Sequence, residues 1–150
     1  VLEEWEERME QTTLYAYIEF SGNDDFPLEV VTESLGVQPT KTWKVGEKVH
    51  ADKPLKRFYT CWIYKIDKLE TLVVEDVLDP LYDLFNSKVD TINQLKKQLD
   101  LEVQIELVIE MENGRTPGLV ISPEFSRFAS SINAMIDIDM YVYPFSGEEE

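Results

Sequence analysis

The sequence predicts an α+β domain, a two-layer sandwich in which a mixed sheet carries helices on one face. Several segments alternate apolar and polar residues with the period of two that is typical of strands. Others space their apolar residues by three and four, as amphipathic helices do. The order of elements contains two strand–helix–strand units around a helical insertion. Handedness rules place such units in one sheet, and the order favours a ferredoxin-like topology.

The first half of the chain contains three expected strands and one helix. Residues 14–21 alternate regularly and predict the first strand. Pro27 suits the first turn of a helix, and Gly36 is a typical helix terminator. Residues 41–49 indicate a short strand or extended loop. Residues 57–66 are rich in β-branched and aromatic side chains and predict a further strand.

Residues 72–99 show helical spacing that one proline interrupts. Because proline costs about 3 kcal/mol inside a helix, two interpretations remain open. Either Asp79 caps a new helix with Pro80 at its first position, or the helix kinks there. Ser87 is a candidate cap for a second helix.

Residues 101–111 form the most regular alternation in the chain. Ile105 and its odd-numbered neighbours are expected to be buried, with Glu106 exposed on the other face. An Asn-Gly turn then predicts a hairpin whose returning strand is 119–121. Ser122 is expected to cap a helix, and residues 136–143 predict the last strand.

Length and composition indicate one domain, because 150 residues with 43% hydrophobic content suffice for one core. We expect an N-terminal extension over 1–13, with Leu2, Trp5 and Met9 on one side of a short helix. The domain would span 14–145 and an acidic tail 146–150. No apolar run reaches about 18 residues and the first residues are acidic. The expected location is therefore cytoplasmic, with no membrane contact.

The charge is strongly negative, with 30 acidic residues against 14 basic ones and a net charge of −16. Such a chain is a poor general binder of nucleic acid. The segment from Lys41 to Lys68, however, contains eight basic residues and three acidic ones, which gives it a net charge of +5. This basic stretch either neutralises acidic neighbours within the fold or steers a partner.

The chain also resembles a known family in the order of its short motifs. The motifs are Tyr15-Ala16-Tyr17-Ile18-Glu19-Phe20-Ser21-Gly22, Leu35-Gly36-Val37-Gln38-Pro39-Thr40, Lys44-Val45-Gly46-Glu47, Trp62 and Ile136-Asp137-Ile138-Asp139-Met140-Tyr141. In this order they resemble the bacterial family called domain of unknown function forty-two seventy-nine, over Leu14 to Tyr143. The resemblance implies a small cytoplasmic protein with no established activity and no known catalytic residues. For some members it implies an immunity protein encoded beside a toxin gene.

The residues indicate no enzyme active site. Cys61 and His50 are the single cysteine and the single histidine, which excludes an internal disulfide and multi-cysteine or two-histidine metal sites. Cys61 lies mid-strand, where cysteine is usually a small buried hydrophobe, and His50 lies in an expected turn. Asp137 and Asp139 share a strand face and could do acid–base chemistry, but a structural role is favoured. We expect no catalytic residue, cofactor or metal ion.

One surface stands out as a candidate partner-binding face. If helices cover one side of the sheet, the other side collects tyrosines and carboxylates, and tyrosine is favoured at interfaces. Its members are Tyr15, Tyr17, Glu19, Glu102, Glu106, Asp137, Asp139, Tyr141 and Tyr143. In a ferredoxin-like order Tyr17 and Tyr141 would be close together. The alternative is that these tyrosines merely cover the sheet.

Three functional hypotheses follow. The first is a non-enzymatic protein-binding module, in its sharpest form an immunity protein that neutralises a basic toxin. The second is a structural or regulatory homodimer formed through the same face, with the basic segment 41–57 meeting acidic surface across the axis. The third is a small-molecule-binding protein with a pocket near Trp43, Lys44 and Trp62.

Overall fold

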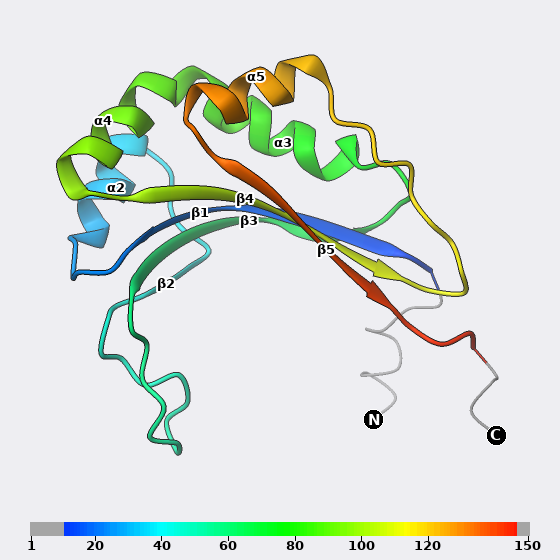
Figure 1. Cartoon of the computed structure of the whole chain (residues 1–150), viewed down its shortest axis with the longest axis horizontal. Helices are drawn as coiled ribbons and strands as arrows, with labels where there is room; N and C mark the ends of the chain where they lie inside the picture. The colour runs from blue at the N-terminus through cyan, green and yellow to red at the C-terminus, as the bar shows by residue number, and fades with distance from the viewer. Residues whose placement is uncertain (1–10, 147–150) are drawn as a thin grey trace.

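The computed structural model describes residues 11–146, which form a five-stranded sheet with helices packed on one of its faces (Figure 1). The α+β sandwich expected from the sequence is confirmed. The short helix expected around Leu2, Trp5 and Met9, and residues 147–150 of the acidic tail, lie outside the described residues. Within residues 11–146, no helix has the length and apolar character needed to cross a bilayer.

The elements follow the expected order with shifted ends. The strands are β1 (Thr13–Gly22), β2 (Lys41–Trp43), β3 (Thr60–Glu70), β4 (Glu102–Met111) and β5 (Met135–Val142). The helices are α2 (Leu28–Leu35), α3 (Glu75–Phe85), α4 (Val89–Leu99) and α5 (Pro123–Ser131), with a 3₁₀ turn over Asn86–Lys88.

The order of the strands across the sheet is β2-β3-β1-β4-β5, and only β4 and β5 are parallel. β1 therefore lies between β3 and β4, antiparallel to both. The expectation that the first and last strands are neighbours is wrong, because β4 separates them. The order thus differs from the ferredoxin-like topology. Local periodicity identifies strands, whereas their pairing depends on contacts between distant segments.

Several local expectations are also corrected. β2 ends at Trp43, and residues 119–121 form no strand; a single bridge joins Val73 to Gly118 in that region. Ser87 lies in the 3₁₀ turn rather than capping α4. Pro80 lies inside α3, so the interpretation in which it starts a new helix is wrong. Pro80 is exposed, so a water molecule can donate the hydrogen bond that the missing N–H of proline cannot make.

The core lies between the sheet and the helices, and the apolar faces predicted for β1 and β4 are buried in it. Ile105 and Leu107 of β4 face the helices with Ile18 of β1, and all three are almost fully buried. Trp62 of β3 meets Phe20 edge-on at 5.3 Å between ring centroids, and its Nε1 donates to Thr32 Oγ1 at 2.9 Å. This hydrogen bond satisfies the one polar atom of a fully buried ring.

Residues 44–59 between β2 and β3 form an extended projection, which we call the arm. Backbone hydrogen bonds Gly46 to Arg57 and Val49 to Leu55 hold its two limbs together. The arm extends to the side of the sheet that the helices do not cover (Figure 1). Leu55 is 62% exposed and Phe58 is 80% exposed. Large apolar side chains at such exposure are candidates for contact with another molecule.

The cap of α5 gives a direct test of the helix start. Ser122 Oγ accepts a hydrogen bond from the Phe125 amide, and Pro123 occupies the first turn, as the sequence predicts. Ser122→Ala is expected to lower the free energy of unfolding by about 1 kcal/mol, since it leaves that amide without its partner. Urea denaturation measures this, with Ser126→Ala as the control on the exposed side of the same helix. Equal stability of the two variants would contradict the cap.

Candidate functional site

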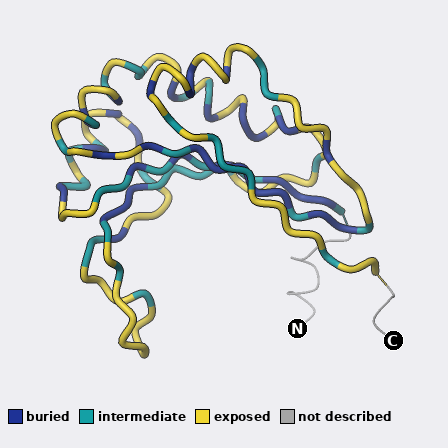
Figure 2. The backbone as a smooth tube through the Cα atoms, viewed as in Figure 1, coloured by how far each residue is buried: buried dark blue, intermediate teal, exposed yellow. Residues whose placement is uncertain are grey.

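The face of the sheet opposite the helices, which we call the open face, is the candidate functional surface (Figures 1 and 2). No described helix packs on it. The register places the side chains of alternate residues there, including nearly all those expected from the sequence. They are Lys41, Trp43, Cys61, Ile63, Lys65, Tyr15, Tyr17, Glu19, Glu102, Gln104, Glu106, Val108, Glu110, Asp137, Asp139 and Tyr141.

Tyr15 and Tyr17 lie at the middle of the open face, on the central strand β1. Both are half-buried. The Lys65 ammonium lies 4.4 Å and the Lys68 ammonium 5.7 Å from the centroid of the Tyr15 ring. Burial, and then the charge of Glu106, raises the pKa of the Tyr17 hydroxyl. Both phenols therefore stay neutral near pH 7 and offer an amphipathic centre to a partner.

One half of the open face, built by β2 and β3, is basic and aromatic. The Arg57 guanidinium of the arm stacks over the Trp43 ring at 4.0 Å, and Lys41 lies 5.5 Å from the same ring. Tyr59 meets Trp43 edge-on at 5.5 Å. Cation–π contacts of this kind fix the base of the arm against the sheet. The intramolecular pairing expected of the basic stretch is seen in part, since Lys68 pairs with Glu110 across the face.

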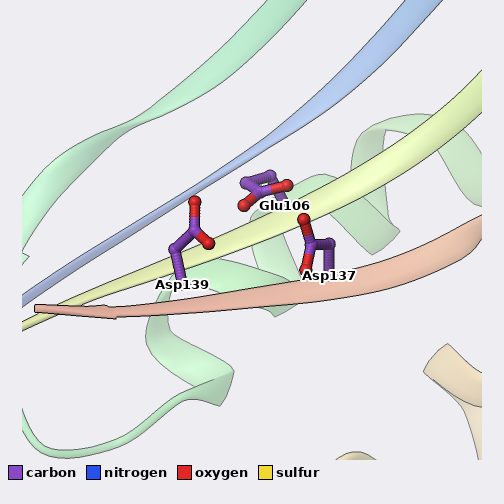
Figure 3. Close-up of side chains that lie close together, drawn as sticks. All are labelled: Glu106, Asp137 and Asp139. Carbon is purple, nitrogen blue, oxygen red and sulfur yellow. The ribbon is translucent and has the colours of Figure 1, made fainter.

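The other half, built by β4 and β5, is acidic. In its middle, Glu106 of β4 meets Asp137 and Asp139 of the edge strand β5, and their carboxylates point toward one another (Figure 3). One oxygen from each residue lies within 4.8 Å of the other two. None of the three has an ion pair with a described residue. We call these three residues the carboxylate cluster.

Glu106 is the unexpected member of the cluster. It is only 3% exposed, so the expectation that it faces water is wrong. Its strand is interior, and Tyr17 on one side and Asp137 on the other cover it. Burial and a side-chain hydrogen bond with Asp139 raise the pKa of the Glu106 carboxyl to about 8. The Gln104 amide donates to Glu106 Oε2 at 2.8 Å, which holds one oxygen in place.

The remaining candidate residues are spread across the face rather than gathered. Tyr141 is 51% exposed on β5, whereas Tyr17 lies two strands away, so the expected proximity of the two rings is wrong. Tyr143 donates to Glu110 Oε2 at 3.2 Å. Glu19 accepts a hydrogen bond from the Cys61 thiol, and Glu102 is exposed at the start of β4. Sequence reasoning missed Gln104 and did not place Lys65 and Lys68 on this face, because their roles depend on which strand lies beside them.

The structure does not bring Trp43, Lys44 and Trp62 into one pocket. Trp43 lies opposite Cys61 and so faces the open side, while the next residue, Trp62, points into the core. The expected pocket is therefore wrong. A surface cavity of ≈ 270 Å³ lies instead where the arm meets the ends of β1 and α4. It is lined by Ser21, Gly22, Asn23, Asp24, Phe58, Tyr59, Leu99, Asp100 and Glu102.

The thiol of Cys61 lacks the features of a nucleophile. The side chain is fully buried, and its Sγ donates to Glu19 Oε1 at 3.1 Å. Burial, and then the charge of Glu19, raises the pKa of the thiol. A reactive cysteine needs the opposite, an exposed and electropositive setting. His50 is exposed in the arm, as the sequence predicts for a turn.

Cys61 is therefore expected to react with Ellman's reagent far more slowly in the native protein than in the unfolded chain. The expected difference is at least a hundredfold, because labelling of the folded state requires opening of the sheet. The release of thionitrobenzoate at pH 8, with and without 6 M guanidinium chloride, measures it. Labelling of the native protein at the unfolded rate would contradict the buried thiol.

The fold and the surface define the class of protein: a single α+β sandwich whose uncovered sheet face is tyrosine-containing, acidic on one half and basic on the other. The chain belongs to the family described as "Domain of unknown function (DUF4279)", whose family model matches residues 11–143. The resemblance seen in the sequence is thus confirmed. No curated protein and no solved structure matches the chain.

Proposed function

We propose that the protein is a non-enzymatic binding module that docks another protein on its open face, and that the partner presents a basic surface. The observation that supports this is the acidic half of the face, where five acidic residues share the face with Tyr141, which is exposed on the edge strand. The five are Glu102, Glu106, Glu110, Asp137 and Asp139. Complementary charge gives specificity and fast association. The sharpest form of the proposal is an immunity protein that neutralises a basic toxin.

Tyr141 supplies the aromatic anchor for such a partner. It is 51% exposed on the open face of the edge strand, whereas its neighbours Met140 and Val142 lie on the other face, opposite the buried Ile109 and Met111. Interfaces typically combine an aromatic or apolar centre with a polar rim, and a few such residues carry most of the binding energy. An edge strand also offers unpaired backbone groups to a partner. The acidic residues would then set the orientation of docking.

The test uses the purified protein encoded by the neighbouring reading frame as the probe. Calorimetric titration is expected to show binding by the unaltered chain. The double variant Glu102→Lys with Tyr141→Ala is expected to weaken it by about 30-fold or more, since an anchor residue typically contributes 2 kcal/mol. Both residues are exposed, so the melting temperature should hardly change.

Glu33→Lys is the matched control, because it reverses a charge on α2, in the helical layer. It should leave binding intact. Absence of binding by the unaltered chain would overturn the immunity form of the proposal. Binding that the double variant and the control weaken equally would overturn the open face as the docking surface.

A second candidate function, a regulatory or structural homodimer, is favoured by the arm. The arm carries Lys44, Lys48, Lys53, Lys56 and Arg57 against Glu47 and Asp52. It projects on the side of the open face, and its Leu55 and Phe58 are exposed. A face with one basic and one acidic half is self-complementary about a two-fold axis, as an isologous dimer requires.

Sedimentation equilibrium distinguishes this candidate from the first. A dimer would be expected to dissociate to monomers in the variant Phe58→Asp and to weaken in 1 M NaCl. Val120→Asp is the control, since Val120 is 60% exposed and lies outside the arm and the open face. A monomeric mass for the unaltered chain at 100 µM would exclude the homodimer.

A further inference from the structure

We propose that Glu106, Asp137 and Asp139 bind a hard divalent cation, such as Ca²⁺ or Mn²⁺, through one carboxylate oxygen each. This inference is independent of the docking proposal, because it concerns an ion within the face rather than a protein upon it. The three oxygens converge on one point from two adjacent parallel strands (Figure 3). Both strands are regular there, with Glu106 directly opposite Asp137.

The second observation is an unsatisfied oxygen. Glu106 is 97% buried, since only 3% of it is exposed, and its Oε1 accepts no hydrogen bond from a described donor. Buried polar atoms are normally satisfied, and the exceptions call for an unseen partner such as water or an ion. Gln104 holds the other oxygen, Oε2, at 2.8 Å. Because Gln104 holds Oε2, Oε1 is the oxygen that can bind an ion. A hydrogen bond from a neighbouring residue that orients the ligand is typical of metal sites.

The chemistry of the three groups selects the class of ion. All donors are carboxylate oxygens, which suit hard cations, whereas the cluster has no nitrogen or sulfur donor to favour zinc or copper. Two ligands of one Ca²⁺ ion can lie up to about 5 Å apart, given Ca–O distances of about 2.3–2.6 Å. The three oxygens lie within 4.8 Å of one another, which is close to this span.

The negative charge of the carboxylate cluster also favours a bound cation. Three neighbouring carboxylates repel one another, and the nearest lysines of the face have other contacts. Lys68 pairs with Glu110, and Lys65 lies over the Tyr15 ring. When all three carboxyls are ionised, a bound dication cancels two of the three negative charges. Asp139 is exposed, so an ion can enter from solvent, and water molecules can complete its coordination.

The alternative is that a proton shared between Glu106 and Asp139 relieves the repulsion and no ion binds. Direct binding measurements separate the two. Chelator-treated protein at pH 7.5 and constant ionic strength is titrated with MnCl₂, and electron paramagnetic resonance reports the free ion. One saturable site is expected, with half-saturation between about 0.1 and 1 mM, as for sites with few protein ligands. CaCl₂ should displace the bound Mn²⁺.

Two variants assign the site. Glu106→Gln and Asp139→Asn are each expected to weaken Mn²⁺ binding at least tenfold, and Asp139→Asn is the safer variant for folding because Asp139 is exposed. Glu70→Gln, which removes an exposed carboxylate of β3, should bind as the unaltered chain does. Non-saturable binding, or equal affinity in all four proteins, would overturn the proposal and leave the shared proton as the explanation. The docking test is unaffected by that outcome, since its variants spare the cluster.

Discussion

Ile105→Ala is expected to lower the free energy of unfolding by about 2–5 kcal/mol, which is a large part of the stability of a domain of this size. Ile105 is fully buried at the centre of the sheet and faces the helices. It lies opposite Ile18 of β1 and Ile136 of β5, so the cavity would form on a strand that is hydrogen-bonded to a neighbour on each side. Such a site can collapse only partly, and the residual cavity adds to the lost transfer free energy.

Urea unfolding monitored by tryptophan fluorescence measures this effect. Leu119→Ala is the control, because Leu119 is 49% exposed in the segment before α5. Its cost should stay within about 0.5 kcal/mol. An Ile105 variant as stable as the Leu119 variant would show that β4 has the opposite register.

The second large effect is a dependence of stability on pH that originates at Glu106. The pKa of its carboxyl is about 8 in the folded state, raised by burial and by Asp139, against 4.5 in an unperturbed chain. The folded state therefore holds the proton more tightly than the unfolded state. This contribution to stability is complete below pH 4.5 and is lost as the pH rises through 8. Between pH 6 and 9 the free energy of unfolding is expected to fall by about 3 kcal/mol.

Glu106→Gln keeps the shape of the protonated side chain and removes the titration. The variant is expected to lose the decline above pH 6 and to be more stable than the unaltered chain at pH 9. Chemical denaturation in EDTA at pH 6, 7.5 and 9 measures both, so that no bound cation contributes. Glu70→Gln controls for the loss of one negative charge. Parallel pH curves for the unaltered chain and the Glu106 variant would contradict the raised pKa.

Much of the fold could be predicted from the sequence because its signals are local. The alternation from Leu101 to Met111 sets the two faces of β4, and Ser122 followed by Pro123 marks the start of α5. The length and partners of a strand are not local properties. β3 extends to Glu70 because it pairs with β1 along that length, although its sequence becomes polar and charged after Ile66. The strand order depends on such long-range pairing in the same way.

The residues of the candidate face could be predicted because alternation is a local signal. The contacts among these residues could not be predicted, because they depend on the order of the strands. Alternation alone places Tyr17, Glu106 and Asp137 on one side of the sheet, as observed. It does not state that β4 is interior, so the burial of Glu106 and its contact with Asp139 were missed. The expected pocket between Trp43 and Trp62 does not form because of the register between β2 and β3. These tryptophans lie on neighbouring strands, and a shift of one residue decides whether they share a face.

The central position of β1 also determines the order in which the sheet can be completed. Thr13 pairs with Glu70 on one side and with Glu110 on the other, so β1 can pair on both edges only after β3 and β4, which follow it in the chain, have been synthesised. Contacts between such distant residues slow folding, because the intervening chain must close into a loop first. Until β4 emerges from the ribosome, one edge of β1 stays unpaired and open to association with other nascent chains. The central strand is therefore expected to be paired on both edges only after residue 111 has been synthesised, and the whole sheet only after residue 142. A nascent chain that stalls before β4 is the form most prone to aggregate.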